Sequence, residues 1–307
     1  MSVIPDHYTI QFARNWRMAV QQKVERLRQY VTVHTGCSGK AKTHNRIESE
    51  EMEEQSTRLQ TTQGTELTTV KRWVFPRPHQ KTTYLDEWDA DLLGETVLPS
   101  GDAVRVHRAA AARKIDKLIL DGISGTNYEG AGNDTGNLTS KARTDVTGHT
   151  IDNTTGGKPA GNLQLLDLIE SKSLLGQKEV YGQDQKEEGA RLVMAVNQSC
   201  LDSLLQAGEN LTSADYASVK ALVEGEIHHF MGIDFIRTEQ LPANSDGDGV
   251  YALLWEKTHM HFDVWGEFKS RLSIRDDLSE AIQIRSKLMA GACRDQDIAV
   301  VWIDCVQ

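Results

Sequence analysis

Cysteine is scarce in this 307-residue sequence, and no two cysteines have the C-x-x-C spacing of metal or redox motifs. The four are widely spaced: Cys37, Cys200, Cys293 and Cys305. This favours reduced, buried thiols over a disulfide framework. Long apolar runs are also missing, since the stretch 298–303 is far too short to span a bilayer. No basic region followed by an apolar stretch opens the chain, so we expect no signal peptide, no membrane contact and a cytoplasmic location.

An excess of positive charge is absent as well. The chain has 34 Lys and Arg against 44 Asp and Glu, a net charge of −10, which argues against a protein that grips specific DNA sequences through a basic face. The charge is uneven, because residues 1–46 carry eight basic and two acidic side chains, whereas 48–54 carry five glutamates. Such a contrast is typical of an extended arm that meets oppositely charged neighbours.

Catalytic signatures are missing too: neither G-x-S-x-G nor H-E-x-x-H occurs. The glycine-rich stretch 130–136 lacks the preceding strand and following helix of a nucleotide-binding loop, which indicates a flexible loop. Segment 244–249 matches the first half of a calcium loop, but the twelfth position is Trp255, so a tight turn between strands is expected.

Histidine and carboxylate clusters are weak as site signals. The candidates for metal ligands are His228, His229, His259, His261 and Asp263. Only Asp263 offers a third ligand beside a histidine pair, so we expect a solvent-facing strand and neither metal nor cofactor. The acidic run 86–91 could hold an acid–base pair, but an acidic surface turn is the simpler interpretation. We therefore expect no catalytic residues and no enzyme.

The N-terminal third combines an amphipathic segment with a long polar one. A helix over 8–31 is predicted by apolar residues at helical spacing, namely Phe12, Trp16, Val20, Val24, Leu27 and Val31. Residues 36–80 are rich in threonine and glutamate and include a strand from Lys71 that ends at Pro76. A two-stranded arm with so few apolar anchors is marginal in water, so we expect it to pack on another subunit.

The remainder predicts an α+β fold. A long helix is expected over 101–121, ended by Gly122, and a glycine-rich loop follows over 122–161. Further helices are expected over 198–206, over 212–223, and after an Asn162 cap with an apolar stripe of Leu163, Leu166 and Ile169. Strands are expected at 192–196, 233–235, 250–255, 259–264, 282–285 and 298–306.

This order of elements resembles that of the major capsid proteins of tailed bacteriophages, with the Hong Kong 97-like fold. The segment 77–88 (RPHQKTTYLDEW) and the closing runs 290–293 (AGAC) and 300–305 (VVWIDC) contribute to a likeness that covers nearly the whole chain. The resemblance implies an N-terminal arm with its helix (1–35), an extended E-loop hairpin (36–80), a peripheral domain (81–189) with spine helix 101–121, an axial domain (190–249) and closing peripheral strands (250–307).

The resemblance also implies a function. The chain would self-assemble as hexamers and pentamers into an icosahedral shell around phage double-stranded DNA, in the host bacterial cytoplasm, and remain in the virion. Scaffolding, portal and cement proteins are candidate partners, with only non-specific contact to DNA. We expect intersubunit contacts at Arg14, Arg17, Glu51, Glu53, Glu54, Lys71, Arg72, Trp73 and Arg77.

Three alternatives stay open at this point. An encapsulin-like compartment shell shares the fold but would package a protein cargo. A tail tube subunit would be mostly β-structure, against which the expected helix 101–121 argues. An enzyme would need an acidic site around Asp86–Asp91.

Overall fold

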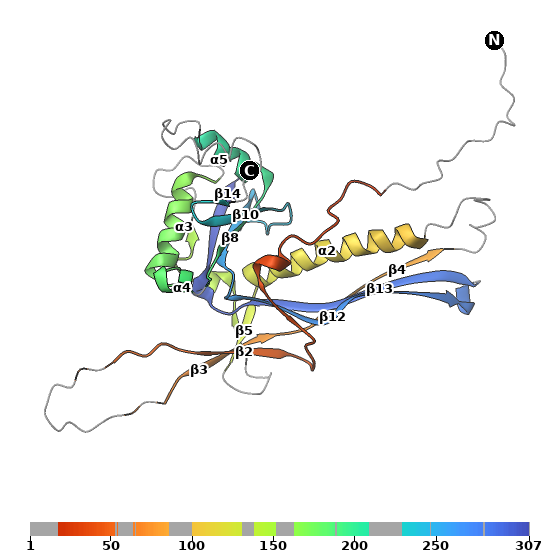
Figure 1. Ribbon diagram of the computed structural model, residues 1–307, viewed down its shortest axis with the longest axis horizontal. Helices are drawn as coiled ribbons and strands as arrows, with labels where there is room; N and C mark the ends of the chain where they lie inside the picture. Colours follow the sequence, from red (N-terminus) through yellow and green to blue (C-terminus); the bar gives the residue numbers. More distant parts are fainter. Residues whose placement is uncertain are drawn as a thin grey trace, which may run out of the picture. The chain divides into compact units, whose positions relative to one another are not determined.

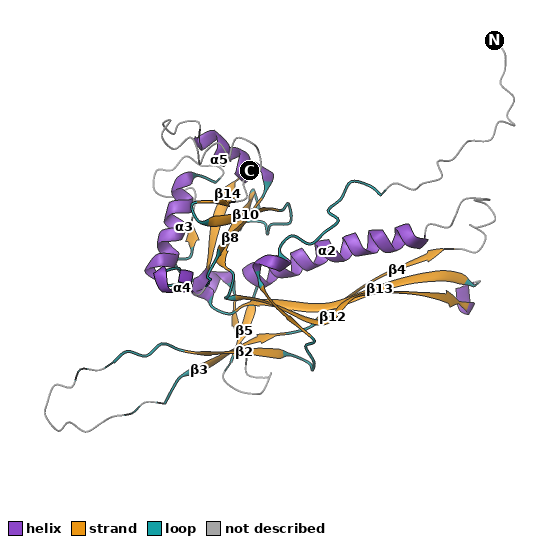
Figure 2. Ribbon diagram, viewed as in Figure 1, coloured by secondary structure: helices purple, strands orange, loops and turns teal. Residues whose placement is uncertain are grey.

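The computed structural model describes residues 18–52, 54, 64, 66–85, 100–130, 138–151, 163–187, 189–208, 229–245, 247–278 and 280–306. The chain divides into two compact units, 1–24 with 78–114 and 266–288, and 25–77 with 115–265 and 289–307. Helix α2 (Ser100–Ser124) and strands β12 (Met260–Arg275) and β13 (Ala281–Arg294) contribute several residues to each unit. Figures 1 and 2 show the mixed helix and sheet architecture that the sequence predicts.

In the first unit, the N-terminal part of α2 packs on strands. These are β4 (Arg77–Leu85), which follows Pro76, and β13, while a 3-10 turn η4 (Asp276–Leu278) joins β12 to β13. The alanine run 109–112 gives α2 high helix propensity, and its small side chains allow the strands to pack close to the helix. The buried side chain of His107 ties the helix to both strands, with its Nε2 2.8 Å from Thr83 Oγ1 and its Nδ1 2.9 Å from Ser286 Oγ.

The second unit is built on a six-stranded sheet. Its order is β7 (Thr150–Ile151), β14 (Val300–Val306), β11 (Gly249–Glu256), β8 (Leu192–Val196), β10 (Ile233–Arg237) and β9 (His229–Phe230). All five residues of β8 are buried, as its unbroken apolar sequence predicts for an interior strand. The confirmed strand β14 also lies inside the sheet, between β7 and β11.

One face of this sheet is covered by helices α3 (Leu165–Gln177) and α5 (Gln198–Gly208), and a short helix α4 (Gln183–Glu187) follows α3. Alternate residues of β8, β10, β11 and β14 form one apolar cluster with the buried residues of these two helices. Most residues between them in the strands, including Trp255 and Trp302, are buried on the opposite face, where Trp255 Nε1 donates to the Tyr30 carbonyl oxygen 3.1 Å away. The sheet is therefore covered on both faces.

A second sheet of this unit carries the hairpin expected over 36–80. Its order is β2 (Lys42–Ile47), β3 (Thr69–Val74), β5 (Asn127–Glu129) and β6 (Thr139–Lys141). β2 and β3 are antiparallel, with Lys42 opposite Val74 and Ile47 opposite Thr69. Before them, η1 (Arg28–Tyr30) leads into β1 (Thr32–Thr35), which pairs in parallel with β12. The predicted hairpin is confirmed over its described strands.

The helix predicted over 8–31 is wrong for its described part. Residues 8–17 lie outside the described residues, 18–27 are irregular, and the only helical turn among residues 18–31 is η1. The buried carboxylate of Asp116 accepts the backbone N–H groups of Arg26 and Leu27 at 3.1 Å, so these amides bond to a side chain and not to a helical carbonyl. The apolar spacing describes a buried face only in part, because Leu27 and Val31 are buried whereas Val20 and Val24 are exposed.

Two details of the predicted helices also differ. α2 does not end at Gly122 but continues to Ser124, and Gly122 instead lets the helix approach β13 closely. The helix after residue 162 begins at Leu165, where the Asp167 carboxylate accepts the Gln164 N–H at 2.8 Å, and Asn162 lies outside the described residues. Of its predicted stripe, Leu166 and Ile169 are exposed, since Leu168, Ser171 and Leu175 face the core.

The structure differs from two of the predicted segments, the one that ends at residue 249 and the loop over 122–161. β11 and β14 share one sheet with β8 and β10, so the division expected at residue 249 falls within that sheet. The expected loop 122–161 contains β5, β6, β7 and a 3-10 turn η3 (Arg143–Asp145) in its described parts. Its residues 131–137 and 152–161 lie outside the described residues. The helix expected over 212–223 also lies outside them. Local sequence did not show these short strands because β5 pairs with β3 and β7 pairs with β14, both far along the chain, and β6 joins the sheet only through β5.

His107 should make the stability of the chain depend on pH. Burial first, and then the nearby charge of Lys81, lower the pKa of His107 below its usual value. The folded chain therefore holds a neutral imidazole, and its stabilising contribution is present above about pH 6.5 and is lost as the pH falls below that value. Between pH 7 and pH 5, His107→Gln should reduce the pH slope of the unfolding free energy by up to about 1.4 kcal/mol per pH unit. Denaturant titration of the unassembled chain measures this slope.

The matched control is His229→Gln, since the His229 side chain is 64% exposed. That variant should not reproduce the reduced slope of His107→Gln. An unchanged slope in His107→Gln would contradict the assignment of a neutral, buried His107.

Candidate functional site

The base of the β2–β3 hairpin is held to its own unit by buried charge. Arg72 is only 1% exposed, and its guanidinium lies 3.1 Å from Asp297 Oδ2 and 3.6 Å from Glu129 Oε2. Its Nε also donates to the Asp295 carbonyl oxygen at 3.1 Å, and Arg46 of β2 donates to the same oxygen at 2.8 Å. Both hairpin strands are therefore bonded to the segment that follows β13.

Arg294 extends this network to the end of helix α2. Its fully buried guanidinium donates to the carbonyl oxygens of Ile123, Gly125 and Lys141 at 2.9, 2.6 and 2.8 Å, and its Nε donates to Asp297 Oδ1 at 2.6 Å. Burial would raise the pKa of Asp297, but Arg72 and Arg294 outweigh it and hold this pKa below its usual value. A cation at the last carbonyls of a helix also complements the helix dipole.

Farther along the hairpin, the described side chains are exposed and mixed in character. Ile47 and Leu67 are each 63% exposed, and Met52 is fully exposed. The glutamates in the same stretch, including Glu51 and Glu54, are exposed as well. β2 and β3 extend away from the six-stranded sheet of the same unit (Figure 1), and the described part of the chain leaves these apolar side chains largely uncovered. Such a combination of apolar and acidic side chains is suited to contact with another molecule.

The predicted contact residues occupy different surroundings. Arg72 and Trp73 are buried within the unit, Lys71 is half-buried, and Glu51, Glu54 and Arg77 are exposed. Arg14, Arg17 and Glu53 lie outside the described residues. Arg72 thus has a clear role in the chain's own fold, in anchoring the hairpin.

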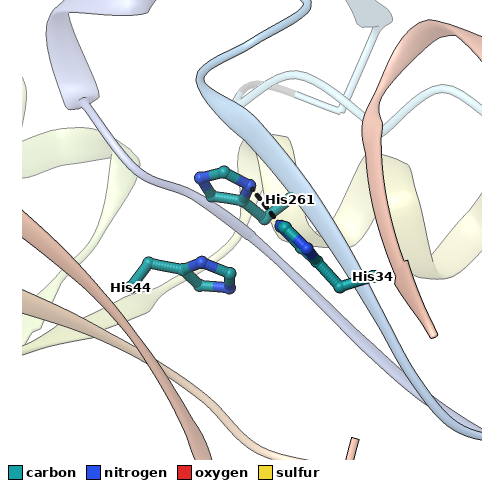
Figure 3. Close-up of side chains that lie close together, drawn as sticks. All are labelled: His34, His44 and His261. Atoms are coloured by element: carbon teal, nitrogen blue, oxygen red, sulfur yellow. Dashed lines mark hydrogen bonds between the residues drawn. The ribbon is translucent and has the colours of Figure 1, made fainter. Parts of the chain in front are cut away.

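A cluster of three histidines lies beside the hairpin base (Figure 3). His34 comes from β1, His44 from β2 and His261 from β12, and one ligand nitrogen from each lies within 4.8 Å of the others. His34 Nε2 is 3.3 Å from His261 Nδ1, and the His44 ring stacks on His261 with 4.0 Å between centroids and 5° between planes. The three imidazoles join strands of two different sheets.

Asp263 supports this histidine cluster from the buried side. Its Oδ2 accepts from His44 Nε2 at 2.8 Å and its Oδ1 accepts from Lys42 Nζ at 2.7 Å. Burial would raise the pKa of Asp263, but these hydrogen bonds outweigh it and lower the pKa. Burial, with His44 and His34 nearby, lowers the pKa of His261 to about 3, so that ring is neutral at neutral pH.

The expectation of a solvent-facing strand at 259–263 is therefore wrong for His261 and Asp263. Their partners His34 and His44 lie more than 200 residues away along the chain, and the pairing of His259 with His261 on one strand did not suggest them. His259 contacts Glu256 at 3.9 Å instead, and His229 pairs with Asp234 at 2.7 Å. Only the segments that carry His44 and His261 were expected to be extended, and no local pattern in the sequence brings the three histidines together, because their pairing requires the sheet topology.

Other sequence candidates have simpler structures. Segment 244–249 is a tight turn, as predicted: Asn244 Oδ1 accepts the N–H groups of Gly247 and Gly249, and the Asn244 N–H donates to the Gly249 carbonyl oxygen at 3.0 Å. The acidic run 86–91 and His228 lie outside the described residues. Cys200, Cys293 and Cys305 are free and buried as expected, and Cys37 is free and half-buried. Within the described part of the chain, no helix is long and apolar enough to cross a membrane.

Solved structures share this fold at low sequence identity. The capsid of cyanophage Pam1 aligns with a TM-score of 0.70 at 9% identity, covering 99% of this chain and 98% of that one. The capsid of cyanophage P-SCSP1u gives 0.68 at 16% identity, over 97% and 93%. The capsid of a native GTA particle gives 0.67 at 10% identity, over 98% and 96%. These similarities confirm the expected capsid fold.

Sequence comparison supplies the family. No curated protein matches the chain. Residues 4–307, however, match the family described as phage capsid protein. Because this match spans nearly the whole chain, the protein belongs to the phage capsid protein family and is a structural subunit of a capsid shell.

Proposed function

We propose that the chain assembles with copies of itself, as hexamers and pentamers, into an icosahedral shell around phage double-stranded DNA. Assembly takes place in the cytoplasm of the host bacterium, and the subunit acts without catalysis. The observation that supports this proposal best is the hairpin, whose base is anchored by Arg72 and whose outer part exposes Ile47, Met52 and Leu67. Scaffolding, portal and cement proteins are further partners of such a shell.

Burial of the hairpin's apolar side chains favours contact with a second subunit. A Leu, Ile or Met side chain contributes about 1.5–3 kcal/mol when it is fully buried instead of exposed. In the described part of one chain, Ile47 and Leu67 remain mostly in water. A neighbouring subunit that covers them would recover this energy in each of its repeated contacts.

Opposite charge favours contact between the hairpin of one subunit and the basic N-terminal segment of a neighbouring subunit. Glu51 and Glu54 are exposed beside the apolar side chains, and Glu53 belongs to the same run. The N-terminal residues 1–46 carry the compensating excess of basic side chains, including Arg14 and Arg17. Contacts between exposed opposite charges are screened at a Debye length of about 8–10 Å in ordinary buffers, so this pairing should weaken with salt.

Electron microscopy of the purified chain, with light scattering across salt concentration, tests the shell. We expect closed shells of uniform size, formed less completely as salt rises. The double variant Glu51→Lys/Glu54→Lys should reduce shell yield severalfold at low salt, because it sets basic side chains against the basic arm. The control Glu179→Lys/Asp184→Lys makes the same change of charge at exposed sites outside the hairpin and should assemble normally.

Two results would contradict the proposal. The first is a monomer or dimer under every condition, coexpression with scaffolding protein included. The second is a shell whose yield responds neither to salt nor to reversal at Glu51 and Glu54, which would remove the charge pairing and leave only apolar contacts. DNA in shells purified from infected cells, in place of a protein cargo, distinguishes a phage capsid from a cargo compartment.

A further inference from the structure

We propose that His34, His44 and His261 form a binding site for a divalent transition metal of the zinc class, which braces the hairpin base against β1 and β12. Imidazole nitrogen is a preferred ligand for zinc, copper, nickel and iron in proteins. The three rings come from separate strands, with one nitrogen of each within 4.8 Å of the others. The site does not depend on the proposed shell.

The distance between two of the nitrogens matches metal geometry. His34 Nε2 and His261 Nδ1 lie 3.3 Å apart (Figure 3). Tetrahedral zinc with bonds of about 2.0–2.1 Å places neighbouring ligand nitrogens about 3.3–3.4 Å apart. In the metal-free protein one of these two nitrogens donates a hydrogen to the other. A metal ion would replace this shared proton, and each ring would turn so that its lone pair points at the ion and no longer along the line between the two nitrogens.

His44 supplies the third ligand after a small rearrangement. Its Nε2 donates to Asp263, so Nδ1 is the nitrogen left to bind a metal, and a carboxylate behind a ligating histidine is a common way to orient such a ring. Its ring now stacks on His261 with parallel planes, whereas a metal lies in the plane of each imidazole that binds it. Binding must therefore turn His44 out of the stack and bring its Nδ1 closer to the other two nitrogens.

The surroundings suit a metal with one open position. The buried Asp263 carboxylate adds negative charge near the three rings, and Lys42, which pairs with it, offsets part of that charge. Cys37 is half-buried nearby, with its Sγ 4.0 Å from Asp263 Oδ1, but it does not belong to the group of three. Three histidines leave the fourth tetrahedral position for water.

A metal at this site would link strands that belong to two different sheets. β1 and β12 belong to one sheet, and β2 is the first strand of the hairpin in another. A shared ion would restrict the movement of β2 at its base, where His44 lies two residues from Lys42 and Arg46. The direction of the exposed hairpin would then depend on metal.

Metal titration of the unassembled full chain, stripped of metal with a chelator, tests the site. Calorimetry with Zn²⁺ should show one ion per chain, and Co²⁺ should give the intense visible absorption of a tetrahedral site. His34→Gln and His44→Gln should each weaken Zn²⁺ binding about tenfold or more, and Zn²⁺ should raise the unfolding temperature of the unsubstituted chain more than that of either variant. Amide exchange over Lys42–Ile47 should slow when Zn²⁺ is added.

His229→Gln is the control for ordinary surface histidines, and it should leave Zn²⁺ affinity unchanged. Circular dichroism of the metal-free variants establishes that they are folded. The proposal is overturned if the folded chain binds no stoichiometric Zn²⁺, or if folded His34→Gln and His44→Gln bind it as tightly as the unsubstituted chain. The three rings would then serve only as a hydrogen-bonded and stacked packing contact.

Discussion

Replacing Arg294 with methionine should destabilise the chain by about 3–5 kcal/mol, which is the usual cost of breaking a buried ion pair by removing one partner. Methionine keeps much of the apolar stem but leaves the carbonyl oxygens of Ile123, Gly125 and Lys141 without the guanidinium. It also removes one of the two arginines that pair with Asp297. Denaturant unfolding of the unassembled chain, followed by tryptophan fluorescence, measures the loss.

Two further variants identify the cause of this loss. Arg294→Lys keeps the charge, but an ammonium group cannot donate to all four acceptors as the planar guanidinium does. Its stability should therefore lie between that of Arg294→Met and that of the unsubstituted chain. Arg105→Met removes an exposed arginine paired with Asp102 and should change stability by no more than about 0.5 kcal/mol. If Arg294→Met were as mild as Arg105→Met, the buried network would not hold the end of α2 and the hairpin base together.

Gly122→Ala should destabilise the chain by about 1–3 kcal/mol, although the same exchange inside an open helix usually stabilises by up to about 1 kcal/mol. A Cβ at residue 122 would lie 2.6 Å from the Ala292 Cβ and 2.8 and 2.9 Å from its backbone carbon and oxygen. The end of α2 would have to move away from β13, which would also disturb the Arg294 contacts to Ile123 and Gly125. Thermal and denaturant unfolding give the change in stability.

Gly176→Ala is the matched control, since Gly176 also lies within three residues of the end of its helix and a Cβ there would meet nothing within 4 Å. It should be neutral or stabilising. Adding Ala292→Gly to Gly122→Ala should restore only part of the stability, because the contacts with the residue 292 backbone remain. A Gly122→Ala chain as stable as Gly176→Ala would show that the helix and strand can separate at little cost.

The candidate sites differ in how far the sequence could predict them. The hairpin could be predicted from the sequence, because residues 36–80 combine β-prone threonines with few apolar anchors. β2 and β3 pair as that pattern indicates. The buried position of Arg72 could not be predicted from the sequence, since its partners Glu129 and Asp297 lie 57 and 225 residues away along the chain. The histidine cluster was missed for the same reason: His261 meets His34 and His44 only through the pairing of β1 with β12 and the place of the hairpin.

Elements with a strong local pattern needed no tertiary information. The alanine-rich run of α2, the apolar runs of β8 and β14 and the alternation in β12 and β13 specify their secondary structure through propensity and periodicity, which act over a few residues. Their order along the chain also indicated the capsid fold.

Tertiary contacts decided the rest. Residues 18–27 have helical apolar spacing yet stay irregular, because Asp116 of α2 binds two of the last backbone amides in that stretch. Gly122 continues a helix that local rules would end there, because β13 packs closely against it. In both cases a buried group distant in sequence contributes more free energy than the weak local preference it opposes, and such a partner is identified only once the chain has folded.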